Sequence, residues 1–435
     1  MPDSALLARH RAVLPGWVPL YYQQPIEPVT GDGSRVTDAD GHTYLDFFCG
    51  ILTNMIGYNV PEVRAAVQRQ LSTGVVHTST LYLIRQQVEL AEKIARLSGI
   101  EDAKVFFVNS GTEATEAALL LATCARRSDQ VLAMRGSYHG RSFGAVAITG
   151  NRGWKPSSLT PVNVHYLHGA DRDHPAFARL SEAEYTAACV ADLEQVLATA
   201  TATDVACLIA EPVQGVGGFI MPPDGLLRAY QEVLDDRGIL FVSDEVQTGW
   251  GRTGDSFWGI GNHGVVPDIM TFAKGLGNGF AIGGVVARGP LMDGLPTVGI
   301  STFGGNPLAT AAASATLDYV LDHGLQENAR VQGRMIIDGL TAHTQRLPLV
   351  GAVRGQGLMF AVDLVDPATG APSPALTARM LEETRERGLL IGTGGLRGNT
   401  LRMAPPLTLS ETEAKEGLQI LTDALAAVNE ESTTR

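Results

Sequence analysis

The sequence predicts an α/β fold in which a mostly parallel, doubly wound sheet is followed by a smaller α+β domain. The first observation is a series of short, nearly continuous apolar runs, at residues 105–108, 131–134, 205–210, 239–242, 269–273 and 282–287. Such runs are typical of strands that are covered on both faces. The second observation is that helical patterns separate these runs, which favours parallel strands joined by helices. The third is a change of pattern after about residue 310.

A hairpin and a helix are expected before these runs. Residues 35–46 alternate about an Asp-Gly pair at 40–41, which favours a tight turn between two strands. Residues 61–97 predict a helix, because Pro61 suits a first turn and apolar residues recur at helical spacing. Between the third and fourth runs, residues 226–237 predict a helix that Gly238 ends.

The C-terminal part has the pattern of a smaller domain. Residues 307–345 predict a long helical stretch, residues 350–365 predict strands, and residues 376–388 predict another helix. A basic, glycine-rich segment then precedes a last helix from Ser410. We therefore divide the chain into an N-terminal segment of helix and hairpin that packs with the small domain (1–60), a large domain (61–310) and a small C-terminal domain (311–435).

Charge and composition argue against several classes of function. The formal net charge is −13 and the pI is about 5.2, which disfavours binding to nucleic acid or to an anionic membrane surface. No apolar run is long enough to predict a membrane span, and the first residues lack the pattern of a secretory signal. Four cysteines without a CxxC spacing favour free thiols, no metal site and a cytoplasmic location.

Two neighbouring apolar runs lead into residues of opposite charge, Asp244 and Lys274. A carboxylate at the end of a buried strand is costly unless it meets a cation. A desolvated amine has a lowered pKa and is nucleophilic. An amine that forms an imine, facing an acid that holds a ring nitrogen, is the minimal equipment for pyridoxal phosphate (PLP) chemistry. Taken alone, a helix-capping Asp244 and a solvated Lys274 remain alternatives.

The segment after the first run has the residues of an anion site. Ser110 and Glu113 have the spacing of a capping box, and Gly111 permits close approach of a ligand. The free N–H groups at the start of this helix, with its dipole, would hold a phosphate. An ordinary capped helix is the alternative. After the second run, Tyr138 could stack on a flat cofactor ring, and a packed tyrosine in a turn is the alternative.

These residues belong to a longer set of motifs in the order of a known family. The chain resembles class III aminotransferases, PLP enzymes of fold type I, over nearly its full length. The motifs are Asp46-Phe47-Phe48-Cys49-Gly50-Ile51, Asn109-Ser110-Gly111-Thr112-Glu113-Ala114, Tyr138-His139-Gly140, Glu211-Pro212-Val213-Gln214, Asp244-Glu245-Val246-Gln247-Thr248-Gly249, Arg252-Thr253-Gly254, Ala273-Lys274-Gly275, Ser301-Thr302-Phe303-Gly304-Gly305-Asn306-Pro307 and Leu401-Arg402-Met403-Ala404-Pro405-Pro406-Leu407. The resemblance implies a seven-stranded type of sheet between helices, plus the small domain.

The resemblance also implies roles at the cofactor. Lys274 would form the imine with PLP and carry a proton, and Asp244 would pair with the ring nitrogen. Gln247 would lie near the ring hydroxyl, and Tyr138 would stack on the ring. The other residues expected at the cofactor are Ser110, Gly111 and Thr112 at its phosphate, His139 beside the ring, Glu211 on the substrate side, and Thr302 at the phosphate of the neighbouring subunit.

Substrates and a partner subunit follow from the same resemblance. Arg402 would bind a substrate carboxylate with its planar fork, with Glu211 and Cys49 as further substrate contacts. Glu211 would pair with Arg402 when a substrate has no carboxylate. The substrates would be an amino acid or ω-amine donor and a 2-oxo acid, aldehyde or ketone acceptor. The family implies a homodimer in which Thr302 crosses the interface.

The alanine–glyoxylate (type 2) and ω-amino-acid:pyruvate transaminases are the subgroup with the greatest resemblance, from residues 47–51 and 392–399. The chain departs from it in three places. Residues 57–61 read Gly-Tyr-Asn-Val-Pro where the subgroup tends to have Gly-His-x-His-Pro, Cys49 stands where a small residue is common, and Arg397 replaces an aromatic residue. Because the first and last would flank the substrate pocket, the identity of the substrate stays open.

We expect transamination by a ping-pong mechanism, in which the donor leaves its amino group on the enzyme before the acceptor binds. A racemase or epimerase, an aminomutase and a decarboxylase share Lys274 and Asp244, so the motifs do not separate these activities. A cofactor-binding regulator without activity would need an attached DNA-binding segment or a lost lysine, and the sequence shows neither.

Overall fold

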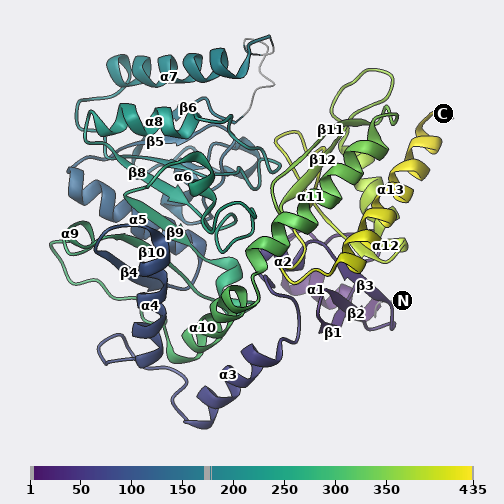
Figure 1. The fold of residues 1–435 in the computed structure, drawn as a ribbon, viewed down its shortest axis with the longest axis horizontal. Coiled ribbons are helices and arrows are strands. Elements are labelled where there is room, and N and C mark those ends of the chain that lie inside the picture. The colour runs from purple at the N-terminus through teal and green to yellow at the C-terminus, as the bar shows by residue number, and fades with distance from the viewer. Residues whose placement is uncertain (1–3, 171–176, 178, 434–435) are drawn as a thin grey trace.

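The computed structural model describes residues 4–170, 177 and 179–433. Two bodies lie side by side in Figure 1: a larger one around a seven-stranded sheet, and a smaller one that carries both ends of the chain. The large sheet has the order β4-β10-β9-β8-β7-β5-β6. Its strands are β4 (Ala103–Val108), β5 (Gln130–Met134), β6 (Asn163–Leu167), β7 (Cys207–Ala210), β8 (Leu240–Asp244), β9 (Ile269–Phe272) and β10 (Gly283–Arg288).

This sheet is mostly parallel, as predicted, and is covered on both faces. Strands β5 to β9 pair in parallel, and β10 runs antiparallel to both β4 and β9. Alternate residues enter two hydrophobic cores: Leu132 of β5 lies in the core with α4, α7, α8 and α10, and Val131 lies in the core with α5. The helices of this body are α3 (Pro61–Ser72), α4 (Arg85–Ser98), α5 (Gly111–Arg126), α6 (Phe143–Ile148), α7 (Glu182–Thr199), α8 (Leu226–Asp235), α9 (Gly289–Met292) and α10 (Pro307–Asp322). Burial on both faces explains the apolar runs.

The structure differs from the sequence-based expectations in three details. Residues 61–97 form two helices, α3 and α4, rather than one. The stretch 307–345 is broken at Gly324, whose left-handed backbone (φ +61°) ends the course of α10 and begins α11 (Leu325–Thr344). Strand β6 was not predicted, because it lies at the edge of the sheet, is mostly only partly buried, and carries polar residues.

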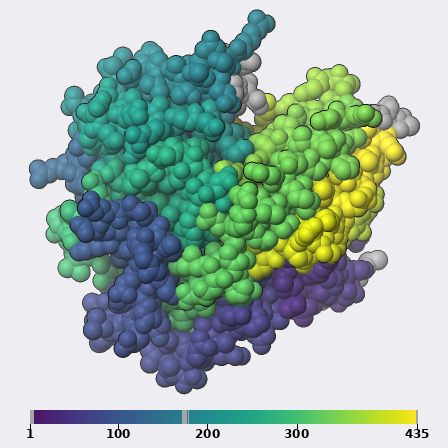
Figure 2. Space-filling model, viewed as in Figure 1, coloured from purple at the N-terminus to yellow at the C-terminus, as the bar shows by residue number. Residues whose placement is uncertain are grey.

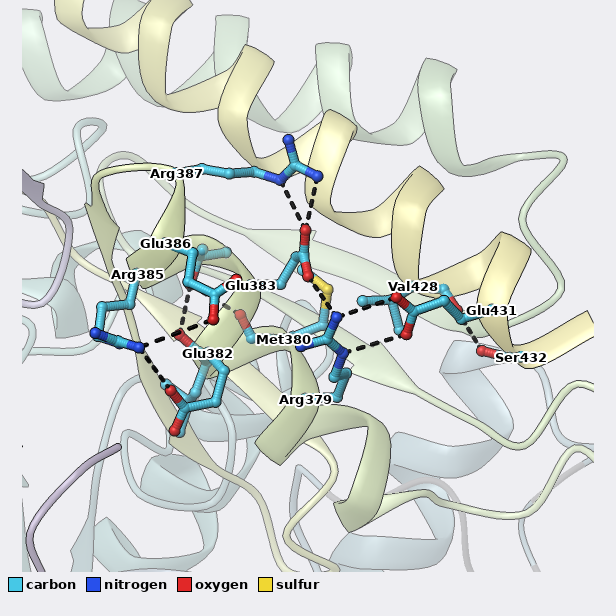
Figure 3. A network of polar contacts seen from close by, with 12 residues as sticks. Arg379, Met380, Glu382, Glu383, Arg385, Glu386, Arg387, Val428, Glu431 and Ser432 are labelled. Atoms are coloured by element: carbon cyan, nitrogen blue, oxygen red, sulfur yellow. Dashed lines mark hydrogen bonds and ion pairs between the residues drawn. The ribbon is translucent and has the colours of Figure 1, made fainter. Parts of the chain in front are cut away.

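The smaller body contains an antiparallel sheet with the order β11-β12-β15-β14, packed against helices. Its elements are α11, β11 (Val350–Gly355), β12 (Phe360–Leu364), α12 (Pro374–Glu386), β13 (Leu389–Leu390), β14 (Gly392–Gly394), β15 (Thr400–Met403) and α13 (Glu411–Thr433). Charged side chains join α12 to α13: Arg379 pairs with Glu383 at 2.8 Å and with Glu431 at 3.1 Å (Figure 3). The predicted α+β character of this part is confirmed.

The N-terminal segment packs beside the C-terminal part of the chain. Its elements are α1 (Ser4–Val13), β1 (Pro28–Asp32), β2 (Arg35–Asp38), β3 (Thr43–Asp46) and α2 (Cys49–Leu52). Strands β2 and β3 form the predicted hairpin, and β3 also pairs in parallel with β13, with Leu45 opposite Leu389. Figure 2 shows the purple N-terminal residues against the yellow C-terminal ones.

Two further expectations concern the whole chain. Within the described ranges, none of the helices combines the length and the apolar character that a bilayer crossing needs. The four cysteines are free thiols, as expected; Cys49, Cys189 and Cys207 are buried and Cys124 is partly exposed.

Candidate active site

The ends of four neighbouring parallel strands bring the predicted site residues together. Asp244 is the last residue of β8, Lys274 follows β9, Glu211 follows β7, and Tyr138 comes shortly after β5. Parallel strands present their carboxyl ends at one edge of a sheet, where α/β proteins place their ligand sites. These four residues line one cavity of about 450 Å³. It is also lined by the predicted residues Ser110, Gly111, Thr112, His139 and Gln247.

Asp244 is buried, and both of its carboxylate oxygens have partners. Oδ2 lies 2.7 Å from Nδ1 of His139. Oδ1 accepts from the hydroxyl of Thr271 at 3.2 Å and from the backbone N–H of Val246 at 3.1 Å. Nε2 of His139 is buried and has no hydrogen-bond partner in the described part of the chain. These contacts orient the carboxylate of Asp244 at the cavity wall. Turns follow Asp244 and no helix begins there, so the alternative of a helix-capping aspartate is wrong.

Lys274 has an unusual backbone conformation at the cavity. Its φ is +46°, which is uncommon for a residue other than glycine and is typical of functional positions. Within the described part of the chain, its amine makes no hydrogen bond or ion pair. Burial, and then the positive charge of Arg402, lower the pKa of Lys274 to about 8, against the opposing charges of Asp244 and Glu211. The alternative of a solvated surface lysine is therefore wrong.

Helix α5 begins at the cavity, and its cap differs from the prediction. Ser110 is the N-cap residue, and its hydroxyl accepts the N–H of Glu113 at 3.3 Å. The carboxylate of Glu113 returns to the backbone N–H of Asn109, at 2.7 Å, rather than to that of Ser110. The capping box is therefore only half formed. The Glu113 carboxylate lies just before the helix, and the first helical N–H groups have no partner within the helix.

Two residues of the first turn of α5 are held by neighbouring segments. A Cβ atom added at Gly111 would lie 3.1 Å from a methyl group of Val246, so a larger residue would be tightly packed between the helix and the turn after β8. The Thr112 hydroxyl accepts the N–H groups of Arg141 (3.1 Å) and Ser142 (2.9 Å). It thereby fixes the loop after His139 against the start of the helix.

Glu211 is held by backbone donors. One oxygen accepts the N–H of Tyr138 at 2.9 Å and the other accepts that of Gly215 at 2.8 Å. Burial raises the pKa of Glu211 to about 7; the charge of Asp244 adds to this effect, and His139 opposes it. The ring of Tyr138 is set in place by an edge-to-face contact with Trp154, with ring centroids 5.2 Å apart.

Arg402 comes from β15 in the smaller body and lies behind Gln247. Its Nη2 donates to Oε1 of Gln247 at 3.1 Å, and its guanidinium lies 4.6 Å from the ring centre of Phe219. The side chain is buried, its Nε has no hydrogen-bond partner among the described residues, and burial lowers the pKa of Arg402 to about 10. No described carboxylate, Glu211 included, lies within ion-pair distance of Arg402. The pairing with Glu211 that we expect when a substrate lacks a carboxylate stays a prediction.

Three predicted site residues do not line the cavity: Cys49, Thr302 and Arg402, which contacts the lining residue Gln247 from behind. Cys49 is fully buried, with Sγ 3.1 Å from the carbonyl oxygen of Asp46, and burial raises the pKa of this thiol. Thr302 is exposed in the segment between β10 and α10. Tyr58, one of the departures from the subgroup, donates its hydroxyl to Asp46 at 2.6 Å. Cys49 and Tyr58 thus both contact Asp46.

Sequence reasoning missed several lining residues: Thr53, Asn109, Gly140, Arg141, Phe280 and Ala281. Arg141 is the most informative of them. Its guanidinium lies 5.2 Å from the ring centre of Trp17, and its place directly after His139-Gly140 was the available signal. Phe280 and Ala281 follow the glycine-rich segment after Lys274, and their residue types alone carry no functional signal.

The sequence profile of one family, described as aminotransferase class-III, matches residues 21–425. The chain belongs to this family. Human mitochondrial alanine–glyoxylate aminotransferase 2 is 34% identical over 97% of the chain and 86% of its own length. The 5-aminovalerate aminotransferase of Pseudomonas putida is 34% identical over 98% of the chain and 99% of its own. A PLP-bound amine transaminase from an uncultivated Pseudomonas species has a TM-score of 0.87 and 32% identity, covering 93% of the chain and 95% of that structure.

This class-III aminotransferase therefore uses PLP and transfers amino groups between a donor and a carbonyl acceptor. The predicted family, subgroup, fold type and enzyme class are confirmed. The alternative activities, racemisation, amino migration and decarboxylation, gain no support from these relatives.

Proposed function

We propose that this aminotransferase takes a donor that carries a carboxylate, an amino acid or an ω-amino acid, and passes its amino group to a 2-oxo acid. The observation that carries the proposal is the buried guanidinium of Arg402, which lacks an anionic partner among the described residues. A buried charge without a counter-ion costs several kcal/mol. Two charge-assisted hydrogen bonds to a substrate carboxylate would offset that cost.

The position of Arg402 supports a substrate role. It bonds to Gln247, which lines the cavity, and its charge is the second largest cause of the lowered pKa of Lys274. Arg141 supplies a second cation at the cavity wall.

The residues present fit PLP. Asp244 is already oriented by His139 and Thr271 and would hold the ring nitrogen, and the partnerless amine of Lys274 would take the aldehyde. The first turn of α5, with Gly111, would hold the phosphate, since backbone N–H groups there lack partners within the helix. When bound, PLP supplies an electron sink for the donor's reacting carbon.

Lys274 would move the proton during transfer. Its pKa of about 8 lies near neutral pH, so that the amine both accepts and returns a proton readily. Asp244, held by His139, would keep the ring nitrogen protonated. Both carboxylate oxygens of Glu211 accept backbone N–H groups, and one of these belongs to Tyr138. Glu211 therefore holds the backbone of Tyr138 in place at the cavity.

A donor screen tests the proposed substrate class. Each amino acid would be paired with the amine that lacks its carboxylate, with pyruvate, glyoxylate and 2-oxoglutarate as acceptors. We expect the carboxylate donors to have the higher kcat/KM. Equal values for the two members of every pair would refute the proposal.

We infer that the working enzyme is a homodimer in which Thr302 reaches the partner's cofactor. Large apolar side chains are exposed around Thr302: Val298 is 94% exposed, Ile300 56% and Phe303 58%. Leu83, which is 98% exposed, belongs to a second segment with exposed apolar side chains. The two segments meet where the ring centres of His77 and Phe303 are 4.7 Å apart. Contiguous exposed apolar surface marks protein interfaces.

Sedimentation equilibrium across a dilution series tests the dimer, and a monomer at micromolar concentration would refute it. For Thr302, the measurement is PLP affinity of the Thr302→Val apoenzyme, followed by fluorescence. We expect the Thr302→Val apoenzyme to bind PLP more weakly, because a methyl group replaces the hydroxyl and one hydrogen-bond donor is lost.

A further inference from the structure

Arg354 lies outside the cavity and joins the two bodies at the loop of residues 215–219. It stands on β11, and its Nε and Nη2 both donate to the carbonyl oxygen of Gly218, at 2.9 and 2.6 Å. The other side of the same guanidinium binds Asp363 of β12 through Nη1 (2.5 Å) and Nη2 (2.8 Å). Asp363 in turn accepts the Thr400 hydroxyl at 2.6 Å, and Thr400 is the first residue of the strand that carries Arg402.

The packing around Gly218 leaves little freedom in this junction. A side chain added there would lie 3.1 Å from both Arg354 Nη2 and the Thr400 hydroxyl oxygen, and the φ of Gly218 is +118°. The neighbouring carbonyl of Val216 accepts the N–H of Gly395 at 3.1 Å. The loop is therefore bound to the smaller body by side-chain and backbone contacts together.

The same loop touches three side chains of the proposed site. Phe219, fully buried with φ at +52°, places its ring 4.6 Å from the guanidinium of Arg402. The N–H of Gly215 holds Glu211. A side chain added at Gly215 would collide with the amide of Gln247, the partner of Arg402.

We propose that Arg354, with Asp363, is a positioning residue for carboxylate recognition. Its fork fixes Phe219 and the loop against the strand of Arg402, so that the guanidinium is held between Phe219 and Gln247 in the pose that accepts a substrate carboxylate. A planar, five-donor fork is suited to bridging a carbonyl and a carboxylate, and a lysine reaches only one of them at a time. The inference rests on the proposed role of Arg402.

The experiment compares Arg354→Met, Arg354→Lys, Asp363→Asn and Arg402→Ala in the full-length, PLP-loaded enzyme. The probes are alanine, ethylamine (alanine without its carboxylate) and propanoate (alanine without its amine) as a competitive inhibitor. We expect Arg354→Met to raise both the KM of alanine and the Ki of propanoate about 10-fold, in line with a lost cation–π pose. The kcat with alanine and the rate with ethylamine stay near wild type. Arg354→Lys and Asp363→Asn give smaller shifts in the same direction.

Arg387→Met is the matched control. Arg387 is also an arginine of the smaller body, bound to one carboxylate, Glu383, at 2.6 Å, but it faces α12 and α13 rather than the loop (Figure 3). The Arg387→Met substitution removes a guanidinium group that binds a carboxylate, as Arg354→Met does. We expect it to leave the KM of alanine and the Ki of propanoate unchanged. Thermal melting of all variants shows whether each is folded, and Asp363→Asn serves if Arg354→Met does not fold.

The outcomes separate the two proposals. If Arg402→Ala affects alanine and ethylamine equally, the carboxylate role of Arg402 fails and the inference fails with it. If Arg402→Ala discriminates between them while Arg354→Met and Asp363→Asn leave KM and Ki unchanged, only the positioning role of Arg354 is wrong. An equal loss with alanine and ethylamine in folded Arg354→Met also contradicts it.

Discussion

Asp244 ends β8 and Lys274 follows the adjacent strand β9 of the same sheet, whereas Arg402 contacts the cavity residue Gln247 from a different sheet in the other body. The register of β8 and β9, with Asp244 opposite Thr271, places the first pair by local strand pairing. Arg402 depends on contacts between bodies, with Gln247 and Phe219. The comparison teaches that the cofactor half is set by one sheet, and the substrate half by how two bodies fit together. Damage to the first half should affect every substrate, and damage to the second should affect the choice among them.

The largest expected effect breaks the cofactor half. Lys274→Ala should lower turnover with every donor by at least about 10³-fold, because no other described amine lines the cavity. Turnover and the visible absorbance of bound PLP are the measurements. Lys155→Met is the control, since Lys155 is also a lysine whose pKa burial lowers, but it binds Ala147 and Tyr166 outside the cavity. Wild-type activity in Lys274→Ala would show that the lysine is misassigned.

Asp244→Asn should come next, with a loss of about 10²- to 10³-fold in kcat for carboxylate and amine donors alike. The amide keeps the shape but loses the charge that His139 now faces. Asp268→Asn is the matched control: Asp268 precedes β9 in the same sheet and pairs with Arg288 at 2.6 Å, away from the cavity. A loss confined to carboxylate donors would contradict the division into halves.

Arg402→Ala sharpens the comparison from the other side. We expect kcat/KM for carboxylate donors to fall about 10- to 100-fold, the value of hydrogen bonds to a charged group, with a much smaller change for amines without a carboxylate. PLP affinity, measured by equilibrium titration, should stay near wild type. Equal losses for both donor classes would place Arg402 in the cofactor half.

The last effect changes stability rather than activity, and it concerns the pH dependence that Glu211 causes. The pKa of Glu211 is about 7 in the folded protein and near 4.5 in the unfolded chain. The folded state therefore binds more protons between these values, so its stability falls as pH rises from about 4.5 to about 7. Glu211→Gln should reduce this loss of unfolding free energy between about pH 4.5 and pH 7 by an amount on the order of 3 kcal/mol. Urea unfolding of the wild-type and Glu211→Gln apoenzymes at pH 4.5, 6 and 7.5 measures the free energy of unfolding. The same change of this free energy with pH in both proteins would contradict the raised pKa.

The cofactor half was more predictable from sequence than the substrate half. Lys274, Asp244, Glu211 and Tyr138 each follow an apolar run, and parallel strands end at one edge, so a local pattern was enough to bring them together. Strand β6 escaped notice because an edge strand with polar residues lacks that pattern.

Contacts between bodies could not be predicted in this way. The contacts of Arg402 with Gln247 and Phe219 are one example, since they join residues that lie far apart in the sequence. The resemblance placed the thiol of Cys49 at the substrate. In the structure, Cys49 has a backbone φ of +50° and its thiol contacts the carbonyl oxygen of Asp46 instead. Backbone conformation and the fit of two sheets decide such contacts, and neither has a signature in residue spacing.

The pairing of β3 with β13 has a consequence for biogenesis. Strand β3 leaves the ribosome well before its neighbour in the sheet, β13 (Leu389–Leu390), is made. Closing a loop of that length carries an entropic cost, and contacts distant in sequence slow folding. During synthesis, the edge of β3 that pairs with β13 therefore stays unpaired until β13 has been translated, and a chaperone would protect the hairpin of β2 and β3 best at this stage.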